Sequence, residues 1–255
     1  MEQSNLEGKG SFLDLFKERK PIMAMLHLKG ETPHEIDERV KREVDLYVNG
    51  GVSAVIVENY FGTYDDMVRA LEYVRAQELP IPYGINCLNC DPMGFELAMN
   101  YGGSFVQLDS VVGHVKPRDE ASIAAFLNLY RSRFAGKVLG GVRFKYQPML
   151  SENTVEEDLV ISKGRCDAVC VTQDATGQET SMDKIEQFRA ALGDFPLIVG
   201  AGVTPENAHK SLAVADGAIV GSYFKDTYKD DGDVSAEHIA ALMAAVREIR
   251  AQEER

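Results

Sequence analysis

The segment Pro196-Leu-Ile-Val-Gly-Ala-Gly-Val-Thr-Pro-Glu-Asn207 passes from an apolar run into a glycine-rich turn, and Ala215-Asp-Gly-Ala-Ile-Val-Gly-Ser-Tyr-Phe-Lys225 repeats the pattern. Each apolar run is short enough to be a buried strand. After the first turn, Thr204 suits the N-cap of a helix and Pro205 suits its first position. Two successive strand–glycine turns of this kind form the phosphate site at the last two strands of a (β/α)8 barrel. The two segments therefore predict that fold.

The glycines of these turns predict where an anion would bind. Because they lack a side chain, Gly200, Gly202 and Gly221 would let backbone N–H groups approach a ligand closely. Ala201 lies between two of them, and a short helix opening near Ser222 would direct its positive end at the same place. We therefore predict that these five residues bind phosphate. The alternative, that the glycines serve only the tight turns, is left open.

The rest of the chain repeats the alternation of apolar runs and amphipathic stretches. Buried strands are predicted over Pro21–Leu28, Ala54–Glu58, Ile81–Asn86, Phe105–Asp109, Lys137–Phe144, Asp167–Thr172, Pro196–Gly200 and Gly217–Gly221. Helices are predicted over His34–Asn49, Tyr64–Gln77, Pro92–Tyr101, Glu120–Phe134, Val155–Lys163, Met182–Leu192 and Pro205–Ala213, and from the cap Ser235 to Gln252. Strands that alternate with helices indicate a parallel sheet, closed as a (β/α)8 TIM barrel, with an open doubly wound sheet as the rival.

The beginning of the chain adds one element to this barrel. Ser11–Arg19 has the pattern of an extra amphipathic N-terminal helix, which we expect to close the barrel from below. Residues 1–10 are predicted to be flexible. Residues 11–255 are predicted to form a single barrel domain, because no linker divides them and the length suits one barrel.

The charge balance limits the partners that this chain can have. The 255 residues carry a formal net charge of −13, with 45% hydrophobic and 26% charged residues. Such acidity does not suit nucleic acid or an anionic membrane as a partner. No apolar run reaches the roughly 18 residues that span a bilayer, and no signal peptide is evident. We therefore expect a cytoplasmic protein without membrane insertion, and self-association into a homo-oligomer is left open.

The four cysteines are predicted to be buried thiols rather than one zinc site. Cys87 and Cys90 follow a predicted strand, whereas Cys166 precedes another that contains Cys170. In a parallel barrel the two pairs lie toward opposite rims, so a common site is geometrically unfavourable. Cys87 and Cys90 alone could still contact a ligand.

Polar residues stand at the C-terminal ends of the predicted strands, where barrels of this kind place their active sites. Those predicted to act in catalysis are Glu58, Asp109 and Lys145. Those predicted to bind substrate are His27, Asn59, Asn86, Arg143, Thr172 and Asp174. The neutral members could read sugar hydroxyls or base edges, or they could cap the turns.

Glu58 is the candidate general base. It follows a buried apolar run, so its carboxylate is expected to be partly removed from water, which suits proton abstraction. The alternative is a salt bridge to Arg143 or Lys145. With Asp109, Glu58 could form an acid/base pair, or bind a divalent metal with His27 as the nitrogen ligand. No cofactor is certain from the sequence, and the metal is left open.

Lys145 could act in three ways. Anion binding ranks first, a surface position second and Schiff-base chemistry third, because acidic neighbours favour the charged ammonium over the nucleophilic amine. Together with Arg143, Lys145 would stabilise negative charge that develops in a transition state.

Five motifs carry a resemblance to a known family: Lys20-Pro-Ile-Met-Ala-Met-Leu-His-Leu28, Ala54-Val-Ile-Val-Glu-Asn59, Gly84-Ile-Asn-Cys-Leu-Asn-Cys-Asp91, Asp167-Ala-Val-Cys-Val-Thr-Gln-Asp-Ala-Thr-Gly177 and Val199-Gly-Ala-Gly-Val-Thr-Pro-Glu-Asn207. In this order, the chain resembles the BtpA/SgcQ family over roughly residues 18 to 245. The resemblance implies a (β/α)8 barrel. The family takes its name from photosystem I biogenesis, and other members look like sugar-metabolism enzymes. Gly141-Val-Arg-Phe-Lys-Tyr146 departs from the family pattern but keeps Lys145.

The leading hypothesis is a barrel enzyme that acts on a small phosphorylated metabolite, a sugar phosphate or a nucleotide-like compound. Proton transfer, lyase or hydrolytic chemistry would use Glu58 as the base and Asp109 as the partner acid or metal ligand. The alternative is a non-catalytic binding or assembly factor on the same scaffold. If Glu58 and Asp109 both lie in salt bridges away from the cavity, the enzyme hypothesis loses its base.

Overall fold

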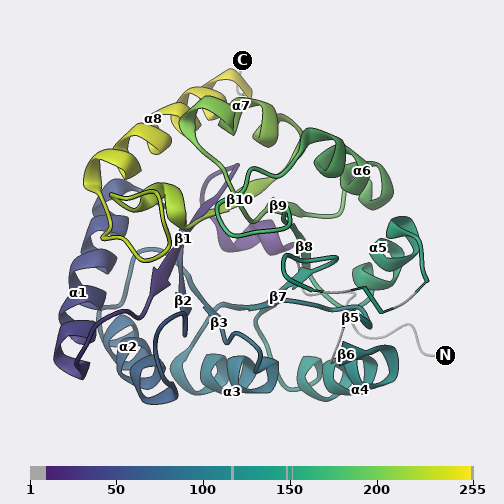
Figure 1. The fold of residues 1–255 in the computed structure, drawn as a ribbon, viewed down its shortest axis with the longest axis horizontal. Coiled ribbons are helices and arrows are strands. Elements are labelled where there is room, and N and C mark those ends of the chain that lie inside the picture. Colours follow the sequence, from purple (N-terminus) through teal and green to yellow (C-terminus); the bar gives the residue numbers. More distant parts are fainter. Residues whose placement is uncertain (1–9, 116–117, 148, 151, 254–255) are drawn as a thin grey trace.

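A computed structural model describes residues 10–115, 118–147, 149–150 and 152–253. Of the segment 1–10, which was expected to be flexible, only Gly10 is among the described residues. In the described part of the chain, eight parallel strands close a barrel, and α-helices surround it (Figure 1). The predicted (β/α)8 barrel is therefore confirmed, and the open sheet is excluded.

The elements of the barrel alternate along the chain. Its strands are β1 Ile22–His27, β2 Ala54–Glu58, β3 Tyr83–Asn86, β4 Phe105–Leu108, β7 Lys137–Gly141, β8 Ala168–Val171, β9 Leu197–Val199 and β10 Gly217–Val220. Its helices are α1 Pro33–Gly50, α2 Tyr64–Ala76, α3 Asp91–Tyr101, α4 Glu120–Arg131, α5 Val155–Lys163, α6 Met182–Leu192, α7 Pro205–Val214 and α8 Ala236–Glu253. None of the helices in the described residues combines the length and the apolar character needed to cross a membrane.

The strands follow one another around the barrel in chain order, and β10 pairs with β1 to close it. Two further short strands, β5 His114–Val115 and β6 Arg118–Asp119, pair with each other as a separate antiparallel hairpin between β4 and α4, which the sequence pattern did not predict. The helices form an outer ring, with the barrel in the middle (Figure 1).

Alternation along each strand divides the core into an inner and an outer part. In β1, the side chains of Ile22 and Leu26 belong to the cluster packed against the helices, whereas Met23 and Met25 belong to the barrel interior. Because both faces are buried, the strands read as continuous apolar runs rather than as alternating patterns. The next inward position of β1 is His27, so the interior changes from apolar to polar at the C-terminal end of the strand.

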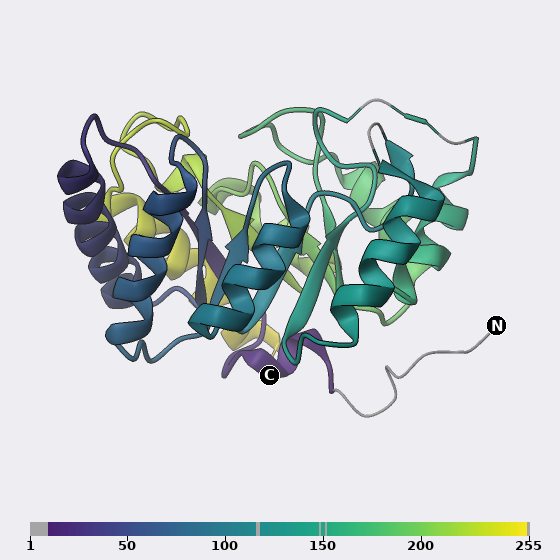
Figure 2. The same ribbon diagram turned by 90° about the horizontal axis from the view of Figure 1, so that it is seen from below.

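The opposite end of the barrel is closed by Phe12. Its side chain is fully buried, and its ring centroid lies 5.5 Å from that of Phe105 in the barrel interior. Figure 2 shows this segment in purple, beneath the barrel. The longer helix expected over Ser11–Arg19 is wrong, because only the 3-10 turn η1, Phe12–Leu15, forms. Residues 17–19 are charged and exposed, so they offer no apolar face that would stabilise further helical turns.

Strand β7 ends earlier than the sequence predicted. It stops at Gly141 rather than at Phe144. Arg143 and Tyr146 have φ of 49° and 61°, in the left-handed region, so the chain turns out of the sheet there. Lys145 therefore lies on the loop that follows the strand.

Candidate functional site

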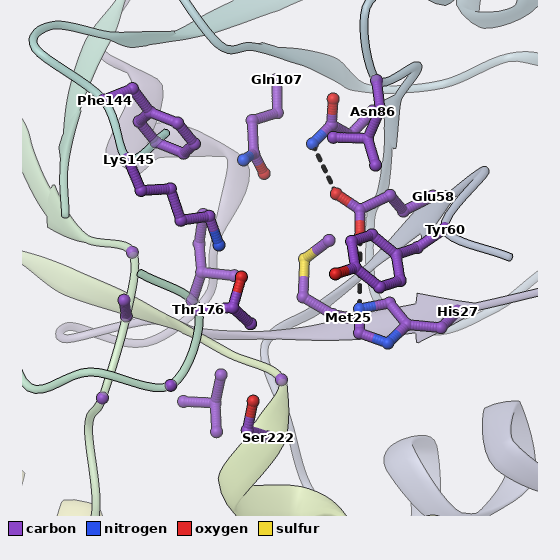
Figure 3. A pocket seen from close by; sticks show the side chains of 18 of the residues that line it. Met25, His27, Glu58, Tyr60, Asn86, Gln107, Phe144, Lys145, Thr176 and Ser222 are labelled. Atoms are coloured by element: carbon purple, nitrogen blue, oxygen red, sulfur yellow. Dashed lines mark hydrogen bonds and ion pairs between the residues drawn. The ribbon is translucent and has the colours of Figure 1, made fainter. Parts of the chain in front are cut away.

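A cavity of about 350 Å³ lies at the C-terminal ends of the strands. Its wall contains ten of the predicted site residues: His27, Glu58, Asn86, Asp109, Lys145, Gly200, Ala201, Gly202, Gly221 and Ser222. Four others do not line it: Asn59, Arg143, Thr172 and Asp174. Figure 3 shows the charged and amide side chains of the wall pointing toward a common space.

Four polar side chains form one row across the neighbouring strands β1 to β4. The strand register pairs His27 with Glu58, Glu58 with Asn86, and Asn86 with Gln107. Paired positions of parallel strands face the same side of a sheet, so all four side chains face the cavity. Asn86 Nδ2 donates to Glu58 Oε1 at 2.8 Å, and His27 Nε2 lies 3.2 Å from Glu58 Oε2 (Figure 3).

The hydrogen-bond partners of His27 assign its tautomer. Its Nδ1 lies 3.0 Å from the backbone oxygen of Asp230. Because a carbonyl oxygen only accepts, Nδ1 carries a hydrogen, and Nε2 then faces Glu58 Oε2. A lone pair directed at a carboxylate would be repelled, so one proton lies between Glu58 and His27. Among the described residues Glu58 thus pairs with His27 rather than with Arg143 or Lys145.

The loop between β10 and α8 covers this end of the row. It contributes the carbonyl of Asp230 to His27 and the carbonyl of Asp231 to Lys29 Nζ, which donates at 2.6 Å. The ring of Tyr60 stacks on the His27 ring, with centroids 5.0 Å apart. Burial, together with a hydrogen bond to Asp230, raises the pKa of Tyr60 to about 12, so this phenol is neutral at ordinary pH.

The two glycine turns follow the neighbouring strands β9 and β10. The short helix expected near Ser222 is the single 3-10 turn η2, Ser222–Phe224. The described residues provide no acceptor for the backbone N–H groups of Ala201, Gly202, Ser222 and Tyr223. All four residues line the cavity. Because backbone N–H groups in folded proteins are almost always paired, these four are available donors for an anionic ligand.

The three glycines of the predicted phosphate site differ in how much space a Cβ atom would have at each position. A Cβ atom at Gly202 would lie 2.3 Å from Glu179 Cα, and the φ of Gly202 is 72°, so this glycine serves the turn itself. Gly200 is similarly enclosed by barrel atoms. At Gly221 the nearest atom to a Cβ would be Met25 Cγ at 3.5 Å, an ordinary contact. Only Gly221 of the three leaves room on its cavity side.

Lys145 and Asp109 lie in another part of the wall. Lys145 Nζ is 5.7 Å from the centroid of the Phe144 ring, and the backbone N–H of Lys145 donates to Thr172 Oγ1 at 2.9 Å. Burial raises the pKa of Cys170 to about 12, and the charges of Lys145 and Asp109 both act on that thiol. Both predicted catalytic groups line the same cavity.

Three of the four predicted substrate-binding residues outside the cavity wall support the loops around it. Asn59 Oδ1 accepts a hydrogen bond from a backbone N–H of the β3–α3 loop at 2.7 Å. Thr172 holds the loop of Lys145, as described above. Arg143 Nε donates to Asp158 Oδ2 of α5 at 2.9 Å, and Asp174 is exposed. The structure does not bring these four side chains to the cavity.

Sequence reasoning missed a number of residues that line the cavity, among them Tyr60, Gln107, Tyr146 and Thr176. Gln107 precedes Asp109 by two residues, so strand alternation could have placed it on the inward face. The other three lie on loops whose course has no periodic signal. Tyr146 Oη accepts a hydrogen bond from the backbone N–H of Thr176 at 2.8 Å, which joins two of these loops.

The donor groups do not form an evident metal site. In the described residues, no group of three or more His, Cys, Asp or Glu side chains is arranged to hold a metal ion. His27 directs both ring nitrogens at protein oxygens, so it does not fit the nitrogen ligand considered for a divalent metal.

The cysteines are free thiols. Burial raises the pKa values of Cys87 and Cys166 to about 12, and neither Cys87 nor Cys90 lines the cavity.

Solved structures with the same architecture have low sequence identity to this chain. The thiamine phosphate pyrophosphorylase of Pyrococcus furiosus is 15% identical, with a TM-score of 0.61 over 90% of this chain and 96% of that chain. The phosphoribosyl anthranilate isomerase of Thermus thermophilus is 13% identical, with a TM-score of 0.60 over 90% of this chain and 100% of that chain. At such identities the likeness shows the fold alone.

Similarity in sequence extends over nearly the whole chain. An uncharacterised protein of Thermococcus kodakarensis is 28% identical over 91% of this chain and 97% of its own length. The photosystem I biogenesis protein BtpA of Synechocystis is 26% identical over 91% of this chain and 90% of its own length. The BtpA family matches residues 18–248, in agreement with the motifs that resemble it. The chain therefore belongs to the BtpA family.

Proposed function

We propose that this protein is an enzyme that transfers protons on a small phosphorylated metabolite. The observation that carries the proposal is the hydrogen-bonded pair of Glu58 and His27, in the same cavity as the unpaired N–H groups of the two glycine turns. A general base needs a fixed orientation and a substrate held nearby. The names of the two fold neighbours described above also refer to phosphate compounds.

The phosphate end of the metabolite would bind at β9 and β10. The N–H groups of Ala201, Gly202, Ser222 and Tyr223 would donate to its oxygens, which needs no positively charged side chain. The remainder of the metabolite would then extend into the polar part of the cavity. In a chain with a net charge of −13, neutral backbone donors are a way to hold an anion without a basic surface.

The reacting part of the metabolite would lie between Glu58 and Lys145. Asn86 and His27 fix both oxygens of the Glu58 carboxylate, so the base has one orientation. β7 lies opposite β1 in the ring of strands, so Lys145 approaches the metabolite from the side away from His27. Glu58 would remove a proton, and the ammonium of Lys145 would stabilise the negative charge that develops on a neighbouring oxygen.

Deuterium exchange tests this chemistry and does not require the product to be identified. Wild-type protein would be incubated in heavy water with a panel of aldose and ketose phosphates, and uptake of deuterium at carbon would be measured by NMR. We expect Glu58→Gln to reduce the exchange rate by about 10²–10⁴-fold, because the shape is kept and the base is lost. Glu72→Gln, the same change on an exposed face of α2, is the matched control and should exchange at the wild-type rate.

A non-catalytic role is the second candidate. It is favoured by one finding, the 26% identity to a relative that is named as a photosystem I biogenesis protein. Absence of exchange with every sugar phosphate, in wild-type protein that still binds phosphate, would favour this binding or assembly role. The same conclusion would follow if Glu58→Gln exchanged as fast as the wild-type protein.

A further inference from the structure

Gln107 is a buried side chain whose amide oxygen has no partner. Only 5% of the residue is exposed, and it lines the cavity. Its Oε1 forms no hydrogen bond with any part of the chain that the structure describes. Figure 3 shows the amide pointing toward the same space as Lys145 and Glu58. An amide oxygen that is buried without a partner destabilises a folded protein. Its position in a cavity wall therefore indicates that a bound molecule supplies the missing donor.

A second amide oxygen in the same cavity has the same property. Gln147 lies on the loop after β7, and its Oε1 is also buried without a hydrogen-bond partner among the described residues. Two acceptor oxygens therefore face one cavity, on β4 and beyond β7. The chemical group that matches several separate acceptors is a set of hydroxyls, because each hydroxyl can turn its hydrogen toward the nearest oxygen.

Gln107 lies across the barrel from the glycine turns. In the ring of eight strands, β4 is four positions from β10 in either direction. With strands spaced about 4.8 Å apart and tilted by about 36°, such a ring is about 15 Å across between backbones. A molecule anchored by phosphate at β10 therefore extends toward β4 with the end that is remote from the phosphate.

We infer that Gln107 is a specificity-determining residue that accepts a hydrogen bond from a hydroxyl at this remote end, and that the ligand class is a polyhydroxylated phosphate ester. The inference rests on the proposed function for the phosphate end of the site. It narrows the ligand from phosphorylated metabolites in general to sugar or polyol phosphates. A ligand that lacks the hydroxyl would leave Oε1 of Gln107 buried and unpaired, so the site rejects it.

Two probes of equal length isolate the hydroxyl groups. Ribitol 5-phosphate and n-pentyl phosphate share a five-carbon chain and a terminal phosphate, and inorganic phosphate reports on the anion site alone. Calorimetric titration of the wild-type protein should give a preference of about 10- to 100-fold for ribitol 5-phosphate over n-pentyl phosphate. In Gln107→Leu this preference should fall by about 5- to 10-fold, because the oxygen of Gln147 remains, and the affinity for inorganic phosphate should be unchanged.

The thermal stability of the unliganded variant separates a ligand contact from a structural role. Leucine has nearly the shape of glutamine and removes the unpaired oxygen, so the Tm of Gln107→Leu should equal or exceed that of the wild-type protein. Gln173→Leu is the matched control, because Gln173 Oε1 accepts a hydrogen bond from the backbone N–H of Ser181 at 3.1 Å. That variant should lose stability and keep the ligand preference.

The outcomes distinguish a failure of the proposed phosphate site from a failure of the role assigned to Gln107. If the wild-type protein binds none of the three probes, the proposed phosphate site itself is wrong. If it binds phosphate but does not distinguish ribitol 5-phosphate from n-pentyl phosphate, the assignment of Gln107 fails and the phosphate site stands. A lower Tm in Gln107→Leu, or a preference that the substitution leaves intact, would likewise overturn the assignment.

Discussion

Gly221→Leu should weaken phosphate binding by about 100-fold while the protein stays folded. Successive side chains of β10 face alternately into and out of the barrel, and Ile219 faces inward. Gly221 follows it by two residues, so a side chain there would also face inward. A Cβ atom at Gly221 would lie 3.5 Å from Met25 Cγ and 3.9 Å from His27 Cε1, both ordinary contacts, so the first atom of a side chain fits there without displacing the barrel. The leucine side chain would cover the N–H groups of Ser222 and the residue after it.

The magnitude follows from the number of donors that are covered. Two of the four unpaired N–H groups belong to the turn after β10. A hydrogen bond to a charged group contributes about 1.5–3 kcal/mol. At the lower end of that range, the loss of two such bonds amounts to about 3 kcal/mol, which corresponds to about 100-fold in Kd.

The assay is calorimetric titration with inorganic phosphate and with ribose 5-phosphate, accompanied by urea denaturation of each protein. Gly164→Leu is the matched control, because Gly164 has a negative φ and a Cβ atom there would have a single neighbour, Ile161 O at 3.7 Å. That variant should bind as the wild-type protein does. Unchanged affinity in a folded Gly221→Leu protein would refute the assignment of the phosphate site.

Further predictions concern packing, burial and pH. Glu43→Gln should destabilise the fold by about 3–5 kcal/mol in urea denaturation, because Glu43 Oε2 pairs at 3.1 Å with Lys225 Nζ and both side chains are buried; a loss below about 1 kcal/mol would contradict this. Phe12→Ala should cost about 3–5 kcal/mol, since it opens the lower end of the barrel interior; an unchanged midpoint would show that the barrel does not need this plug. Burial raises the pKa of Cys87 to about 12, so at pH 8 only about one thiol in 10⁴ is the reactive thiolate. Alkylation followed by mass spectrometry should therefore label Cys87 only as the pH rises toward 12, whereas Cys90 is partly exposed and open to the reagent; equal labelling of the two at pH 8 would be inconsistent with the burial of Cys87.

The barrel could be predicted from the sequence because its signals are local and repeated. Each strand is an apolar run, and most helices begin at a recognisable cap residue, as at Thr204. The cavity positions of His27, Glu58 and Asn86 could be predicted because these residues end neighbouring strands, which bring equivalent positions together.

Contacts between loops carry no comparable signal. An arginine at position 143 is equally compatible with pointing into the cavity and with pairing with Asp158. The left-handed φ that turns it outward could not be predicted, because glycine, the residue typical of that conformation, is not present there. The course of the chain after β7 and β10 decides where Tyr146 and Asp230 lie. Gln107 could have been predicted, because it lies two residues before Asp109 and therefore faces the same side of β4.

The contact between His27 and Asp230 has a consequence for the order in which the site is assembled. The two residues are 203 positions apart, so the carbonyl that fixes the imidazole arrives only when the last loop has folded over the first strand. In a chain that ends before Asp230, the imidazole would lack this acceptor and would be free to rotate and to change tautomer. The pairing of Glu58 with an oriented His27 is therefore completed late in folding. A partly folded barrel would hold the Glu58 carboxylate without an oriented imidazole beside it, so the proton transfer that we propose would be confined to fully folded chains.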